Sequence, residues 1–193
     1  MSANAILKAI AAVVFAIYEL YWLAAAYTAA RSKPRRKRPS LLSNLEFYLF
    51  SSLEVLLFAQ LIGLQVLPFR SSVSVPILGL ALFVLGVSVS TLGRLALGTN
   101  WASSHEYQIK TDQTLVTSGV YRYIRHPIYV GVFLVYTGGG LVAQSYLFLF
   151  YAVLFVAIGH VWAKREEALL AGSFGSAYMD YIKHTKRFIP FVY

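Results

Sequence analysis

The stretch from Thr114 to Gly131, TLVTSGVYRYIRHPIYVG, gathers side chains that could hold a charged ligand. It turns from polar to apolar at Pro127, and because proline is favoured in the first turn of a helix, we predict a helix that begins there with His126 at its cap. A helix start offers unpaired N–H groups and the positive end of a dipole, which suit a carboxylate or a phosphate. Nearby cationic and aromatic side chains could bind an anion, an adenine or a cation: Arg122, Arg125, His126, Tyr121, Tyr123 and Tyr129.

The same residue types at the start of a membrane helix can also serve as interface anchors. The longer string favours a functional role. LVTSGVY, followed by RHP and then YVG, resembles the signature of the isoprenylcysteine carboxyl methyltransferases, integral-membrane enzymes that use S-adenosylmethionine. The resemblance runs from His105 and Gln108, through Arg165-Glu166-Glu167, to the closing Ile189-Pro190-Phe191. It covers roughly residues 100 to 193, about the C-terminal half of the chain.

The resemblance implies where the cofactor binds. The family's cofactor-binding positions fall on Gln108, Gln113, Thr114, Leu115, Val116, Tyr121, His126, Pro127, Ile128, Tyr129 and Glu166. Arg125 adds a donor for the cofactor's carboxylate, and Glu166 could accept from its ammonium group or ribose hydroxyls. Because a sulfonium methyl group is displaced in line, we expect catalysis to consist mainly of positioning, desolvation and electrostatics.

Two departures from the family's pattern concern the ligands. Gln113 stands where the family often has histidine. Trp162 stands where the family has its substrate-binding arginine, four residues before Glu166. Lys164 or Arg165 could take over the acceptor's carboxylate, so we place Arg165 with Glu166 and His126 as candidate catalytic residues. The acceptor itself stays open.

Three further functions compete with methylation of an isoprenylcysteine carboxylate. That carboxylate is already ionised at neutral pH and needs no base, whereas a phospholipid amine would have to lose a proton, to His126 or Tyr129. Sterol reductases, which use a nicotinamide cofactor, share a similar R-H-P-x-Y turn and an ending like Pro190-Phe191-Val192-Tyr193. Glu166-Glu167 and LVTSGVY favour the methyltransferase. A non-catalytic scaffold would leave residues 105–131 unexplained.

Composition indicates a membrane protein of one domain, 1–193. Hydrophobic residues make up 58% of the 193 and charged residues 13%, against about 25% charged in soluble domains. The absence of cysteine excludes disulfides and thiolate chemistry. The four histidines lack metal-ligand spacing, so we predict no metal site.

Apolar segments predict an all-α protein with five transmembrane helices. Each segment is near the roughly 20 residues that span a bilayer: about 6–27, 45–67, 75–97, 127–143 and 145–163. After Lys164, charged and apolar residues alternate at helical spacing, which predicts a separate amphipathic helix. The 98–126 linker, the start of the fourth helix and this C-terminal helix are expected to form a cytosolic cofactor pocket.

The net charge of +9 would suggest nucleic acid as a partner in a soluble protein. Here 15 of the 17 lysines and arginines fall in 31–40, in 94–126 and after residue 163, segments that five spans place on one side. The positive-inside rule then puts the N-terminus outside and the C-terminus and active site in the cytoplasm. Glu19 and Glu54 lie within spans, and we expect both to face the bundle interior.

Overall fold

The computed structural model describes residues 2–31, 41–101 and 113–193. Within these ranges the chain is helical, and strand-like pairing occurs only as isolated bridges. The α-helices are α1 (Ala3–Arg31), α2 (Leu41–Leu61), α3 (Ser74–Leu97), α4 (Pro127–Ala143), α5 (Leu147–Phe174) and α6 (Ser176–His184). Short 3₁₀ helices cover Gly98–Asn100 and Gly119–Arg122.

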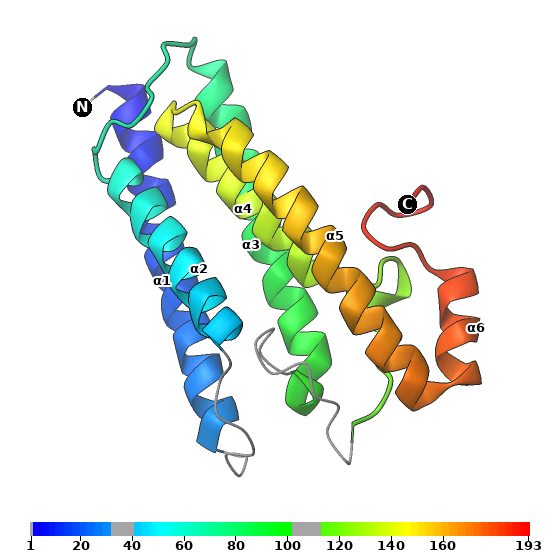
Figure 1. Ribbon diagram of the computed structural model, residues 1–193. Coiled ribbons are helices and arrows are strands. Elements are labelled where there is room, and N and C mark those ends of the chain that lie inside the picture. Colours follow the sequence, from blue (N-terminus) through cyan, green and yellow to red (C-terminus); the bar gives the residue numbers. More distant parts are fainter. Residues whose placement is uncertain (1, 32–40, 102–112) are drawn as a thin grey trace.

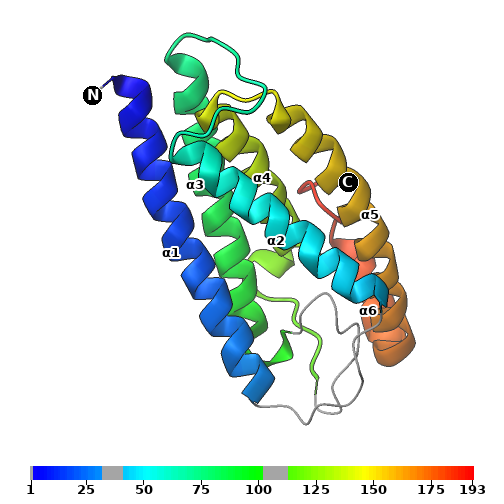
Figure 2. The same ribbon diagram turned by 60° about the vertical axis from the view of Figure 1, so that its left-hand side comes forward.

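The first five helices lie side by side as an up-and-down bundle (Figures 1 and 2). The N-terminus lies at the same end as the turn between α4 and α5, and α6 folds back beside the far end of α5 (Figure 1). Among the described residues, three helices are long and apolar enough to cross a membrane, over Ala3–Thr28, Ser74–Asn100 and Leu147–Phe174. Many large apolar side chains on them point outward, among them Val13, Leu78 and Val153. Such a surface fits an integral membrane protein.

The remaining predicted spans are shorter apolar helices, Tyr48–Leu61 and Pro127–Ala143. The prediction that the second helix reaches residue 67 is wrong, because α2 ends at Leu61. Gly63 then adopts a φ of +127°, a conformation that glycine allows and a helix does not. The chain beyond it meets the α4–α5 turn, where the Tyr146 N–H donates to the Leu67 carbonyl over 2.9 Å.

The predicted break after Lys164 is also wrong, because α5 continues without interruption to Phe174. Residues 165–171, REEALLA, are mostly strong helix formers, so nothing stops the helix where its pattern changes. The break comes at Gly175, whose φ of +52° ends α5. Only the nine residues of α6 form a separate amphipathic helix.

Glycines bring α3 and α4 into backbone contact. A Cβ atom placed on Gly138 would lie 2.6 Å from the Phe83 nitrogen and 2.7 Å from the Gly79 oxygen, and Gly86 and Gly131 are as closely packed. Small residues allow this approach between membrane helices. The contact fixes the position of α4 and, with it, that of its N-cap residue His126.

We predict that Gly138→Ala lowers the free energy of unfolding by about 1–3 kcal/mol, because the new methyl group meets backbone atoms that no rotamer change can move. Thermal unfolding of the detergent-purified protein measures the effect. Gly172→Ala is the matched control, since nothing lies within 4 Å of its added Cβ. Equal melting temperatures for the two variants would contradict the close α3–α4 contact.

Candidate active site

The site is built on the start of α4. His126 is its N-cap residue and Pro127 stands in its first turn, as predicted. The C-terminal tail lies alongside this start: the Arg125 N–H donates to the Lys186 carbonyl over 2.8 Å, and the His126 N–H donates to the Arg187 carbonyl over 3.2 Å. Two segments about sixty positions apart in the chain, the start of α4 and the C-terminal tail, are therefore joined side by side and form one wall of the site.

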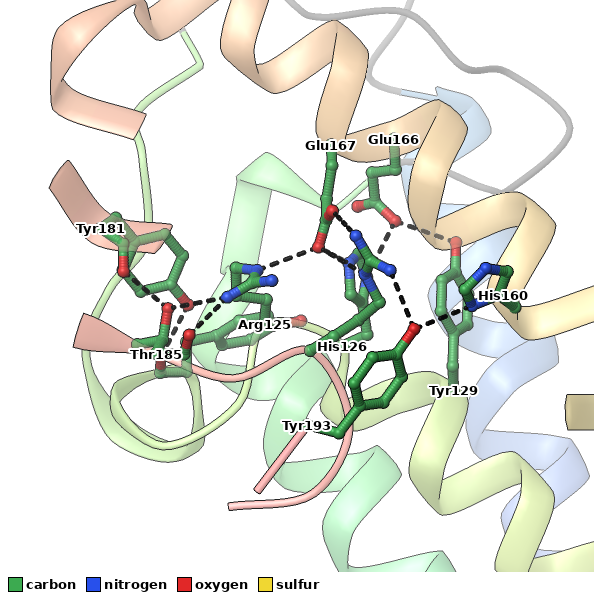
Figure 3. A network of polar contacts seen from close by, with 11 residues as sticks. Arg125, His126, Tyr129, His160, Glu166, Glu167, Tyr181, Thr185 and Tyr193 are labelled. Carbon is green, nitrogen blue, oxygen red and sulfur yellow. Dashed lines mark hydrogen bonds and ion pairs between the residues drawn. The ribbon is translucent and has the colours of Figure 1, made fainter. Parts of the chain in front are cut away.

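Glu167 ties this wall to α5 (Figure 3). Its Oε1 atom accepts from the Arg125 Nε at 2.9 Å, from the Arg187 Nε at 3.0 Å and from the His126 Nε2 at 3.2 Å. A second Arg187 nitrogen donates to Oε2, and Arg125 also donates to the Thr185 carbonyl. The Glu167 side chain is only 10% exposed. Its negative charge is paired entirely within the protein, which makes the role of Glu167 structural.

Glu166 points another way. Its Oε2 atom accepts from the Tyr129 hydroxyl at 2.9 Å and lies 3.5 Å from the His126 Nδ1, while the side chain stays 41% exposed (Figure 3). The His126 and Tyr129 rings stack with their centroids 5.3 Å apart and their planes 7° from parallel. A carboxylate with free surface beside two flat rings can accept hydrogen bonds from a ligand.

His126 is held between the two carboxylates. Burial alone would lower the pKa of its imidazole, but its hydrogen bonds to Glu166 and Glu167 and their negative charges outweigh burial and raise that pKa. The ring therefore carries a proton over a wider pH range than a free histidine does. A protonated ring can donate from both nitrogens, which orients both carboxylates.

These residues border a cavity of about 390 Å³ that extends between the helices. Ten of the twelve predicted cofactor-binding residues line it: Gln113, Thr114, Leu115, Val116, Tyr121, Arg125, His126, Ile128, Tyr129 and Glu166. Pro127 is instead buried beneath it against Gly93 of α3. Gln108 lies outside the described residues, as does His105. Arg165, predicted to be catalytic, is exposed on α5 and is not among the lining residues.

The cavity also contains residues that no cofactor assignment included. Glu19 of α1 and Glu54 of α2 line it, which confirms that both face the interior, and so does Trp162 of α5. Tyr178 and Tyr181 of α6 complete its wall. Tyr178 and Tyr181 are three residues apart on α6, and the turn at Gly175 brings this helix back to the segment before α4, where the Tyr181 hydroxyl donates to the Tyr121 carbonyl. Arg187, the second arginine bound to Glu167, could not be assigned to the site from the sequence, where only its positive charge is apparent.

Comparison with known proteins gives the class. The model of the phospholipid methyltransferase family matches residues 75–177, just over half of the chain, and the chain belongs to this family. The match includes α4, α5 and nearly all of α3, and with them Arg125, His126, Tyr129, Glu166 and Glu167 of the site. All of α1 and α2 and most of α6 lie outside it.

Similar proteins narrow the class and confirm the resemblance to the isoprenylcysteine methyltransferases. The protein-S-isoprenylcysteine O-methyltransferase of Tribolium castaneum is 30% identical over 60% of this chain and 41% of its own, and that of Schizosaccharomyces pombe is 33% identical over 57% and 52%. The cobalt-zinc-cadmium resistance protein CzcN of Cupriavidus metallidurans is 34% identical over 58% and 49%. The chain thus spans about half the length of the curated relatives it matches.

The fold has a counterpart among solved structures. The eukaryotic intramembrane Ras methyltransferase ICMT aligns with a TM-score of 0.58 at 24% identity, over 78% of this chain and 52% of that one. At this identity the likeness establishes the fold, and the chemistry has to be argued from the site itself.

The two neighbouring glutamates should respond differently to loss of charge. We predict that Glu167→Gln lowers the free energy of unfolding by about 3–5 kcal/mol, because two arginines and His126 lose a common buried counter-charge. Glu166→Gln should cost no more than about 1 kcal/mol, since its side chain is half-exposed. Denaturation followed by circular dichroism compares them. Equal losses of unfolding free energy would contradict the assignment of a structural role to Glu167 alone.

Proposed function

We propose that the protein transfers the methyl group of S-adenosylmethionine to a lipophilic acceptor, with the carboxylate of an isoprenylcysteine-like lipid as the leading candidate. One observation carries the proposal: a single cavity joins the polar cluster of Glu166, His126 and Tyr129 to an interior formed by α1, α2 and α5. A polar cofactor and an apolar acceptor can meet in such a cavity. The names of the curated relatives support the same reaction.

The cofactor supplies an electrophilic methyl group on a sulfonium, and the chain's residues bind and orient it. Glu166 accepts from its ammonium group or its ribose hydroxyls, and the Tyr129 hydroxyl holds the glutamate in place. Tyr121 and the stacked His126–Tyr129 pair offer aromatic surface to the adenine. These groups fit a zwitterionic nucleoside, because the lining combines carboxylate, cationic and aromatic side chains. Ordering both reactants in a dry cavity lowers the barrier to in-line transfer.

The charges around the cavity favour a second candidate acceptor, a lipid with a primary amine. Glu19 and Glu54 line the inner part, and Trp162 stands where the family has its substrate-binding arginine. The guanidinium of Arg125 is already bound to Glu167 and Thr185. Carboxylates among aromatic side chains such as Trp22 and Phe50 attract a cationic head group. An amine must lose a proton before it attacks. The raised pKa of His126 favours its protonated form and Tyr129 donates its hydroxyl to Glu166, so Glu19 and Glu54 are the groups able to take the proton.

We also propose that all five bundle helices cross the bilayer and that the cofactor end faces the cytoplasm. α4, with 17 residues, is at the short limit for a span, but it runs beside α3 and α5 along the bundle (Figure 2). The bias of lysine and arginine supports this orientation, since the C-terminal ends of α1, α3 and α5 lie at one end of the bundle (Figure 1).

Calorimetric titration of the detergent-purified protein tests cofactor binding. We expect micromolar affinity for S-adenosylmethionine and S-adenosylhomocysteine, loss of binding of at least tenfold in Glu166→Ala because the ligand's donors lose a charged acceptor, and no binding of NADPH. Asp180→Ala is the control, since it removes an exposed acid on α6 that is outside the cavity lining. Binding of NADPH alone would replace the proposal with a reductase.

Transfer of a radiolabelled methyl group to each of two lipids separates the acceptors. If the acceptor is a farnesylated cysteine with a free carboxyl group, Glu19→Gln and Glu54→Gln should retain or increase its methylation, because each removes negative charge near an anion. If it is a phospholipid amine, the same variants should lower its methylation at least tenfold. Methylation of neither lipid by the wild-type protein would reject both candidates.

A further inference from the structure

Two tyrosines of α6, Tyr178 and Tyr181, line the cavity, and their hydroxyls have different fates. The Tyr181 hydroxyl donates to the Tyr121 backbone carbonyl over 2.6 Å. Tyr178 is only 1% exposed, and its buried hydroxyl has no hydrogen-bond partner among the described residues. The rings are neighbours, with centroids 5.9 Å apart. The Tyr181 hydroxyl is therefore paired within the fold, whereas the Tyr178 hydroxyl is unpaired within the part of the chain that the structure describes.

A buried hydroxyl without a partner is unfavourable, because it has left water and gained nothing in return. Buried polar groups in native proteins almost always have a partner, so each exception calls for an explanation. Phenylalanine would fill the same space without this cost. Since Tyr178 borders the cavity, a ligand that enters the cavity is the simplest source of the missing partner.

The surroundings keep Tyr178 a neutral donor. Burial raises the pKa of its phenol, and the negative charge of Glu167 raises it further, against an opposing effect of the Arg125 guanidinium. A neutral phenol can donate its O–H to an acceptor atom at any pH at which the protein is studied.

The position of Tyr178 indicates which part of the ligand it meets. α6 lies at the polar end of the cavity, since Tyr181 bonds to Tyr121 and Thr185 at its end accepts from Arg125. This is the end that contains Glu166. The two acids that bear on the acceptor, Glu19 and Glu54, come from α1 and α2 instead.

We propose that Tyr178 is a further binding residue of this site, whose hydroxyl donates a hydrogen bond to an oxygen or nitrogen of the S-adenosyl ligand. The inference rests on the proposed function, because the ligand is the one proposed there. It assigns a role to a residue outside the set predicted for the cofactor.

The test compares Tyr178→Phe with Tyr181→Phe, each titrated with S-adenosylhomocysteine and melted without ligand. Tyr178→Phe should weaken binding about tenfold, because the ligand loses one hydrogen bond. Its melting temperature without ligand should be unchanged or higher, because an unpaired hydroxyl is removed. Tyr181→Phe should do the reverse: a lower melting temperature, because the Tyr121 carbonyl loses its partner, and less than about a threefold change in affinity.

Wild-type affinity retained by Tyr178→Phe would overturn this inference and leave the proposed function intact. A melting temperature that falls as far in Tyr178→Phe as in Tyr181→Phe would also overturn it, because the hydroxyl would then have a partner within the fold. A wild-type protein that binds neither S-adenosylmethionine nor S-adenosylhomocysteine would reject the proposed function, and this inference with it.

Discussion

The structure depends on one carboxylate, that of Glu167. Two arginines and a histidine converge on it, so α5, the start of α4 and the C-terminal tail share a single electrostatic centre. Each of the three segments would otherwise end in unpaired charge at the edge of the bundle. The neighbouring Glu166 inherits its position from this arrangement. The acid proposed to bind the ligand is thereby held next to a neutralised one, and its own side chain remains partly exposed.

Close helix packing supplies the second constraint. Glycines on both helices let α4 rest against α3 with no side chain between them at Gly86 and Gly138, and this fixes the depth and direction of α4. The start of α4 is therefore a rigid platform for His126 and Tyr129. The opposite side of the cavity is made of large side chains, such as Trp22, Phe50 and Phe155. A rigid polar end suits the proposed cofactor, and an aromatic lining suits the proposed lipophilic acceptor.

Much of this could be predicted from the sequence, for identifiable reasons. Proline after a polar segment fixed the first residue of α4, and apolar length located the bundle helices. The ends of α2 and α5 were misplaced because hydropathy does not report helix termination: Gly63 and Gly175 decide it through backbone conformation. Glu166 and Glu167 looked equivalent in the sequence, and they are distinguished only by the contacts of Arg125 and Arg187, both of which pair with Glu167. The orphan hydroxyl of Tyr178 is likewise invisible without tertiary contacts.

Because α5 is uninterrupted, its length fixes how far Glu166 lies from the turn between α4 and α5. At about 1.5 Å of rise per residue, the nineteen steps from Leu147 to Glu166 measure roughly 29 Å along the axis, close to the roughly 30 Å thickness of a bilayer's hydrocarbon core. If α5 enters the core at its first residue, Glu166 emerges where hydrocarbon gives way to head groups. A water-soluble donor and a lipid-dissolved acceptor would then meet at that boundary, and neither would have to leave its own phase.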